Sequence, residues 1–225
     1  MRGKTAIKIS AGLAATALLV TACGGGSDDD AGSSSAVVSI EVAEPQYLLP
    51  SNTNETSGSQ VLAALFSPLV DYDADNKPVE VAAESITTTD NVTWTIKLKD
   101  GYTFHNGEKV TSDSYINAWN YGSYGPNGQN NSYFWEKIEG WADLQSEDPD
   151  KDGPQKAPDP KAKTLTGLQK VDDLTFTVKL SAAFSEFKTM LGYTAFYPLP
   201  AAAFASEGVI KEASRTPSSA TAPSR

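Results

Sequence analysis

Residues 91–111 read NVTWTIKLKDGYTFHNGEKVT and decide the fold. The first eight of these residues alternate between polar and apolar side chains, and the apolar ones are Val92, Trp94, Ile96 and Leu98. Strict alternation predicts a β-strand that buries one face. The dipeptides Asp100-Gly101 and Asn106-Gly107 then predict two turns around a short extended segment. This stretch therefore places a half-buried strand and a tight turn system near the middle of the chain.

A second pair of strands is predicted later in the chain. Leu168–Val171 and Leu174–Leu180 flank Asp172-Asp173, and the second run alternates as regularly as residues 91–98. Two such runs around a turn predict a β-hairpin. A β-branched run at residues 36–43 indicates one more strand.

Helices are predicted between these strands. Thr111 or Ser112 can cap a helix that runs to about Gly122. Gln60–Phe66 carries apolar residues at helical spacing, after a polar stretch, Ser51–Ser57, that predicts a loop. Phe184–Leu191 indicates a short third helix. The mixture of strands and helices predicts an α/β fold.

Composition excludes several classes of function. The chain has 225 residues, 40% of them hydrophobic, which allows a buried core. Its net charge of -10 repels nucleic-acid phosphates, so we expect no nucleic-acid partner. One Cys and one His argue against a disulfide scaffold and a zinc site. Nucleophile-elbow, phosphate-loop and zinc-protease motifs are all missing, so we expect a protein that is not an enzyme and has no cofactor or metal.

The amino terminus has the pattern of a secretory signal. Residues 1–8 are basic and Ile9–Val20 is apolar, but about 20 apolar residues are needed to span a bilayer. The small residues before Cys23 resemble the lipobox of bacterial lipoproteins. That resemblance implies a signal peptide at residues 1–22 and a lipidated Cys23; the alternative is an ordinary signal peptide with an incidental Cys. Residues 23–35 are rich in Gly, Ser and Asp and predict a flexible tether.

The folded part is predicted at residues 36–205. Within it, residues 146–163 are rich in Asp, Pro and Lys and predict a surface insertion. Asp148–Gly153 matches the start of a calcium loop, but the remaining ligands of such a loop are missing, so a solvated insertion is the better interpretation. Residues 206–225 have no aromatic side chain and predict a disordered or aberrant tail.

Four short phrases carry a resemblance to a known family. They are Val81–Ser85 (VAAES), Lys99–Gly101 (KDG), Phe104–Gly107 (FHNG) and Val110–Thr111 (VT). In this order they resemble the extracellular solute-binding proteins of dipeptide and oligopeptide ABC importers, and the resemblance extends over roughly Val37–Ala205. It implies a two-lobed periplasmic-binding-protein-like fold. The chain is well short of such proteins, so we expect an amino-terminal fragment that holds most of lobe one.

The resemblance also implies a function and a site. Such proteins capture short peptides outside the cytoplasmic membrane, here as a lipid-anchored monomer, and pass them to an ABC permease and its ATPase. Asn54, Glu55 and Thr56 fall where lobe one offers backbone groups to the ligand, and Tyr133 falls where an aromatic ring lines the cleft. Because the second lobe is missing, we expect impaired peptide binding.

Other interpretations remain open at this point. Asn54, Glu55 and Thr56 are equally consistent with a solvated loop, and Tyr133 with a packed aromatic cluster. The protein can also be an inert or adhesive secreted lipoprotein. A third possibility is a binder of another solute such as nickel, haem or an oligosaccharide, although one His is a poor basis for a His-ligated metal.

Overall fold

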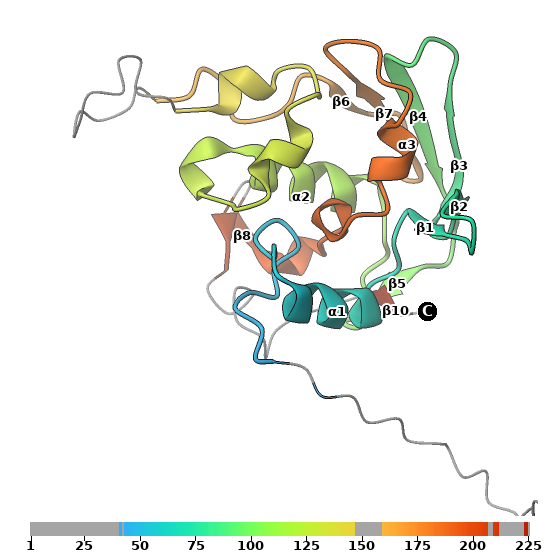
Figure 1. The fold of residues 1–225 in the computed structure, drawn as a ribbon. Coiled ribbons are helices and arrows are strands. Elements are labelled where there is room, and N and C mark those ends of the chain that lie inside the picture. The colour runs from blue at the N-terminus through green and yellow to red at the C-terminus, as the bar shows by residue number, and fades with distance from the viewer. Residues whose placement is uncertain (1–40, 42, 147–158, 207–208, 212–222, 225) are drawn as a thin grey trace, which may run out of the picture. The chain divides into compact units, whose positions relative to one another are not determined.

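In the computed structural model of the protein, a four-stranded antiparallel sheet forms the framework (Figure 1). The structure describes residues 41, 43–146, 159–206, 209–211 and 223–224, all within the unit Glu41–Arg225. The strand order in the sheet is β3 (Ala83–Thr88), β4 (Thr93–Leu98), β7 (Thr175–Lys179) and β6 (Leu168–Lys170). The sheet is therefore built from two hairpins that are remote in sequence.

Strand β4 is the predicted half-buried strand. Trp94, Ile96 and Leu98 are buried, and they alternate with the more exposed Thr93, Thr95 and Lys97. Ile96 pairs with Ile86 of β3 on one side and with Phe176 of β7 on the other. Because one face of β4 packs into the core, its register is fixed by the burial of these side chains.

The two predicted turn systems are also confirmed. Gly101 and Gly107 both adopt positive φ angles, 94° and 86°, which are accessible to glycine at little cost. Strands β6 and β7 form the predicted hairpin around Asp172-Asp173, with Leu168 opposite Val178.

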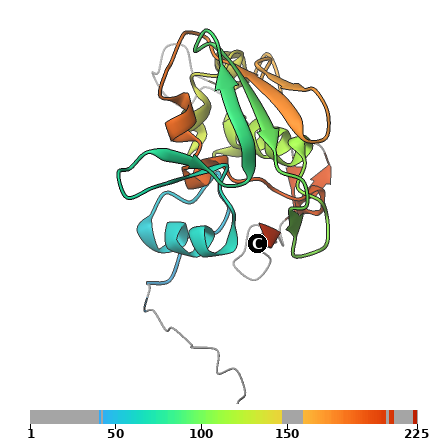
Figure 2. The same ribbon diagram turned by 90° about the vertical axis from the view of Figure 1, so that its right-hand side faces the viewer.

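Helix α2 (Ser112–Ser123) packs against this sheet, as Figure 2 shows from the side. Thr111 is its N-cap and forms a capping box with Ser114. Its apolar face buries Tyr115 and Trp119 completely. The Trp119 ring meets the rings of Phe176 and Phe196 edge-on, so helix, sheet and carboxyl-terminal turns share one aromatic core.

Helix α1 (Thr56–Leu65) begins earlier than the sequence predicts. The sequence predicts a start near Gln60 and a loop that includes Thr56 and Ser57, and both predictions are wrong. The Glu55 carboxylate is the cap: its Oε1 accepts a hydrogen bond of 2.7 Å from the Gly58 N–H. Glu is not among the preferred capping residues, so the sequence contains no ordinary start signal here.

The remaining elements are short. Strand β1 (Val70–Tyr72) pairs with β2 (Pro78–Glu80), and this hairpin lies above α1 in Figure 2. Helix α3 (Phe187–Met190) is shorter than the predicted Phe184–Leu191. The others are β5 (Thr103–Phe104), η1 (Gly125–Asn127), η2 (Ser132–Trp135), η3 (Trp141–Leu144), η4 (Thr194–Phe196), η5 (Ala201–Ala203), β8 (Phe204–Ser206), β9 (Val209–Ile210) and β10 (Pro223–Ser224).

Several predictions fall outside the described residues. These are the signal peptide at 1–22, Cys23, the tether at 23–35, and Asp148–Gly153. Of the predicted strand at 36–43, only Glu41 and Ala43 are described, and neither is in a strand. Within residues 206–225, the described Ile210 is buried at 3% exposure, and β10 pairs with β5. The domain boundaries remain predictions.

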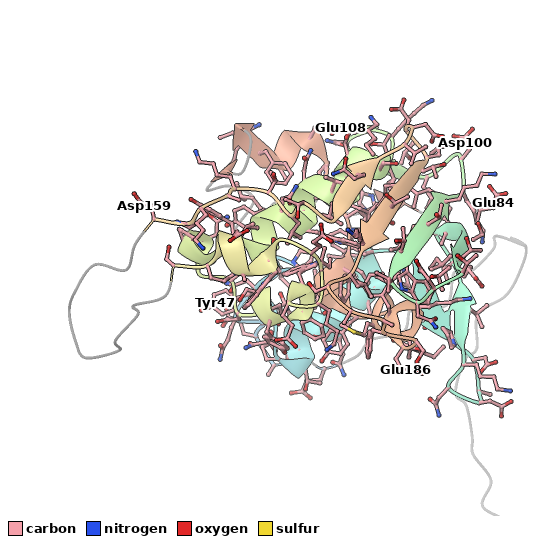
Figure 3. The ribbon with its side chains drawn as sticks, turned by 90° about the horizontal axis from the view of Figure 1, so that it is seen from above. Tyr47, Glu84, Asp100, Glu108, Asp159 and Glu186 are labelled. Carbon is pink, nitrogen blue, oxygen red and sulfur yellow. The ribbon has the colours of Figure 1, made fainter. Side chains whose placement is uncertain are left out.

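Acidic side chains lie on the outer surface of this framework. Figure 3 labels Glu84, Asp100 and Glu186, which are exposed and lie at the periphery. Among the described residues, no helix has the length and hydrophobicity needed to cross a bilayer.

Candidate functional site

A pocket of about 490 Å³ lies at the amino-terminal end of α1. Its walls come from three parts of the chain: α1 and the residues before it, strand β1, and the turns that follow α3. The lining residues are Asn54, Glu55, Thr56, Ser59, Gln60, Ala63, Asp71, Gly192, Tyr193, Thr194 and Tyr197. Three of the four residues that the sequence singles out for ligand binding, Asn54, Glu55 and Thr56, thus lie together in one pocket.

The first wall is held in place by a buried asparagine. Asn131 is completely buried, and its Nδ2 donates hydrogen bonds to the carbonyl oxygens of Pro50 (3.0 Å) and Thr53 (2.8 Å). Its neighbour Asn130 donates from its N–H to the Asn52 Oδ1 at 3.0 Å. These bonds fix the segment that leads into α1, so the pocket wall has a defined position before any ligand arrives.

The start of α1 itself is tightly packed. At Gly58, a Cβ atom would lie 2.2 Å from the Glu55 Oε1 and 2.6 Å from the Tyr47 carbonyl oxygen. Glycine is therefore required for the Glu55 side chain to fold back over the helix end. The backbone of Glu55 is extended, with φ -123° and ψ 158°.

The second wall is formed by the turn after α3 together with the β1–β2 hairpin, which packs against it. The Tyr72 hydroxyl donates a hydrogen bond of 2.6 Å to the Thr189 carbonyl oxygen. A Cβ on Gly192 would lie 2.5 Å from that hydroxyl oxygen, so only glycine allows the close approach. The Lys188 Nζ lies 2.5 Å from the Glu80 Oε1 and joins α3 to β2. Hairpin and turn are thus clamped together at two points.

The charges around the pocket are acidic. Among the described residues that line it, Glu55 and Asp71 are acids and none is Lys, Arg or His. Burial, the Asp71 carboxylate and Tyr193 together raise the pKa of Tyr72. The Tyr72 phenol therefore stays protonated and keeps its hydrogen-bond donor at physiological pH.

Tyr133 lies outside the lining of this pocket but is connected to it through stacked rings. Its ring stacks on Phe134 at 4.6 Å between centroids, and the Phe134 ring lies 4.5 Å from that of Tyr193, which lines the pocket. Tyr133 is 54% exposed, whereas the neighbouring Trp135 is completely buried. The cluster therefore combines one completely buried ring, Trp135, with two half-exposed residues, Tyr133 and Tyr193.

Sequence reasoning missed the residues of the second wall. Asp71 lies in a three-residue strand that is too short to show alternation, and Gly192 and Tyr193 follow a one-turn helix. No motif marks them; only the tertiary packing of β1 against α3 brings them to Asn54 and Glu55. Within the described part of the chain, no three His, Cys, Asp or Glu residues form a group that could hold a metal ion.

Comparison with known proteins supplies the family. Residues 77–222 match the model for the bacterial extracellular solute-binding proteins, family 5, middle part. The oligopeptide-binding protein OppA of Bacillus subtilis is 34% identical over 77 residues, which are 34% of this chain and 14% of that protein. The chain thus aligns with only a small part of this curated relative.

Solved structures share the fold. The substrate-binding domain of an oligopeptide ABC transporter from Bacillus anthracis has a TM-score of 0.61 and 27% identity, over 72% of this chain and 29% of that one. OppA of Haemophilus influenzae, in complex with RPPGFSPFR, has a TM-score of 0.64 and 24% identity, over 80% of this chain and 33% of that one.

The fold is thus the mixed α/β fold of periplasmic binding proteins, and this chain corresponds to about a third of such a structure or less. The family match covers well over half of the chain and agrees with the family that the sequence motifs predict. The protein belongs to the bacterial extracellular solute-binding proteins of family 5.

Proposed function

We propose that this chain is the substrate-binding component of an ABC importer, and that it captures short peptides outside the cytoplasmic membrane for a permease and its ATPase. The observation that carries the proposal is the pocket in which Asn54, Glu55 and Thr56 meet the turn at Gly192 and Tyr193. The names of the Bacillus subtilis and Bacillus anthracis relatives, both oligopeptide proteins, support peptides as the solute. Capture and release, rather than catalysis, is the proposed activity.

The pocket wall suits an extended peptide. Glu55 has an extended backbone, and in the described part of the chain the N–H groups of Glu55 and Thr56 donate to no protein acceptor. The first N–H groups of a helix have no partner inside the helix. A peptide lying beside this segment can accept from them, which recognises the peptide backbone whatever its side chains are.

We propose further that these 225 residues bind peptides weakly on their own. The solved relatives are about two and a half times as long as this chain, and the pocket described here is open. Ligands of such proteins gain affinity when two lobes close around them and exclude water. Isothermal titration with a pool of di- to pentapeptides measures this; micromolar or tighter binding would overturn the proposed impairment.

A second measurement tests the function itself. Titrating the ¹⁵N-labelled protein with short peptides at millimolar concentration reports weak binding through the amide resonances. We expect shifts at pocket residues such as Ser59 and Gly192, and none at Gly107, which does not line the pocket. Absence of any shift at the pocket contradicts the proposed function.

The proposed location is the outer face of the membrane, with Cys23 as the lipid attachment point. The observation behind it is the signal-like sequence at residues 1–22 followed by the lone Cys of the chain. Several acyl chains hold a protein firmly, since each buried methylene contributes about 0.8 kcal/mol to partitioning.

A further inference from the structure

Two carboxylates line the pocket, and for one of them no group in the described part of the chain balances the charge. The two are Glu55 and Asp71. The Glu55 carboxylate accepts from the Gly58 N–H at 2.7 Å and lies at the amino-terminal end of α1, where the helix dipole is positive. The helix end therefore compensates the charge of Glu55. Asp71 lies in strand β1 and not at the end of a helix, so it has no such compensation.

Asp71 makes one local hydrogen bond. Its Oδ1 accepts from the Tyr72 N–H at 2.8 Å. Among the described residues, no Lys, Arg or His nitrogen lies within 4.0 Å of its carboxylate, although eight such pairs form elsewhere in the described chain. The side chain is exposed, so its negative charge is available to a ligand in the pocket.

The strand that carries Asp71 is fixed in position. Asp71 pairs with Val79 in the β1–β2 hairpin, and the next residue, Tyr72, is bonded to the Thr189 carbonyl oxygen. The hairpin lies above α1 in the view of Figure 2. Asp71 and Tyr193 both line the pocket, and Tyr193 is 52% exposed. A carboxylate favours a cation through its charge, and an exposed aromatic side chain does so through its ring face.

We propose that Asp71 makes this pocket prefer peptides that present an ammonium group to it. The proposal rests on the proposed peptide-binding function and adds a charge preference to it. The ammonium can come from the peptide's amino terminus or from a lysine side chain, since the chemistry is the same. Because Asp71 is exposed, we expect a preference of about two- to fivefold in Kd, typical of a solvated ion pair.

Four tripeptides separate these sources. They share the sequence Ala-X-Ala, where X is lysine or its uncharged analogue norleucine, and the amino terminus is free or acetylated. Kd values come from titrations of the ¹⁵N-labelled protein, followed at the amides of Ser59, Ala63 and Gly192. We expect the acetylated norleucine peptide to bind most weakly. Whichever ammonium improves binding in the unmodified protein, and no longer does so in Asp71→Asn alone, is the one that Asp71 receives.

Two variants complete the experiment. Asp71→Asn removes the charge but keeps an oxygen for the Tyr72 N–H, and we expect it to abolish the preference. Asp75→Asn is the matched control: its side chain is 77% exposed, lies in the same hairpin and does not line the pocket. This variant changes the net charge of the protein by the same amount as Asp71→Asn but leaves the charge of the pocket lining unchanged. We therefore expect it to keep the preference.

The outcomes distinguish the two proposals. Equal binding of all four peptides to the unmodified protein overturns the role of Asp71 and leaves the proposed function standing. The same holds if Asp71→Asn keeps the preference, or if both variants lose it equally, because long-range charge then explains the effect. If no peptide shifts any pocket resonance, this inference and the proposed function both fail.

Discussion

The hydroxyl of Tyr72 and the carbonyl oxygen of Thr189 are joined by a 2.6 Å hydrogen bond, although 117 positions separate the two residues in sequence. The hydroxyl lies close to Gly192, where an added Cβ would be 2.5 Å from its oxygen. The bond connects the hairpin that carries Asp71 with the turn that carries Tyr193, and so it holds the two parts of the second wall together. Substitutions along this contact are therefore expected to change the shape of the pocket.

Gly192→Ala tests the contact directly. The added Cβ would lie 2.5 Å from the Tyr72 hydroxyl oxygen and 2.7 Å from its Cζ, so the Tyr72 ring or the hairpin that carries it must shift. We expect a loss of about 1–3 kcal/mol in the free energy of unfolding, as for overpacked sites, together with weaker peptide binding. Urea denaturation measures the first and the amide titration the second.

A double variant provides the control for this substitution. Tyr72→Ala removes the ring that the new methyl group meets, so adding Gly192→Ala to it costs much less than in the unmodified protein. Equal costs in both backgrounds would show that Tyr72 is not what restricts position 192.

Glu55→Ala tests the unusual helix cap. Without the carboxylate, the Gly58 N–H loses its 2.7 Å bond and α1 loses a negative charge at its positive end. We expect about 1 kcal/mol of destabilisation in urea, the usual cost of removing a cap. Glu84→Ala serves as the control, because Glu84 is exposed and only forms a surface ion pair with Lys97, so its removal costs at most about 0.5 kcal/mol. Equal effects of the two substitutions would rule out a capping role.

The parts of the fold that the sequence predicts are those in which one local signal is strong. The alternation in residues 91–98 and 174–180 predicts β4 and β7, and the capping residues Thr111 or Ser112 predict the start of α2. The start of α1 is missed because its N-cap is Glu55, and Glu is not among the residues preferred at the N-cap position.

The residues of the candidate site also fall into two groups, those that the sequence indicates and those that it does not. Asn54, Glu55 and Thr56 follow from the resemblance to a family, but Asp71 and Gly192 cannot be found from any local pattern. A strand of three residues has no measurable period, and a glycine needed for a close approach looks like any other glycine until its neighbour, Tyr72, is known. The second wall exists only through contacts between distant segments.

The ion pair between Glu80 and Lys188 makes a prediction about pH. The hydrogen bond from Lys188 lowers the pKa of Glu80 below its ordinary value of 4.5. A carboxyl group whose pKa is lower in the folded protein stabilises it above the unfolded pKa, and this contribution is lost as the pH falls through the folded pKa. The stabilisation is therefore fully present at neutral pH and declines below about pH 4.5.

Glu80→Gln isolates this contribution from the other acids. Glutamine can still accept from Lys188 but does not titrate in this range. We expect the variant to be less stable than the unmodified protein by about 1 kcal/mol or less at pH 7, because the pair is partly exposed. The difference between the two proteins should shrink as the pH approaches 3. Urea denaturation at each pH measures it, and a difference that stays constant would contradict the assigned pKa direction.

Cys23→Ser tests the proposed anchor in a bacterial host. If Cys23 is acylated, the unmodified protein incorporates labelled palmitate and sediments with the membrane fraction, whereas the variant incorporates none. Serine keeps the size of the side chain and removes the thiol that an acyl-transfer enzyme needs, so the loss of label reports the chemistry of this residue. An ordinary signal peptide predicts a different pattern: both proteins are secreted, neither is labelled, and both are found in the soluble fraction. Since Cys23 is the lone Cys of the chain, any thiol-dependent label must come from this position.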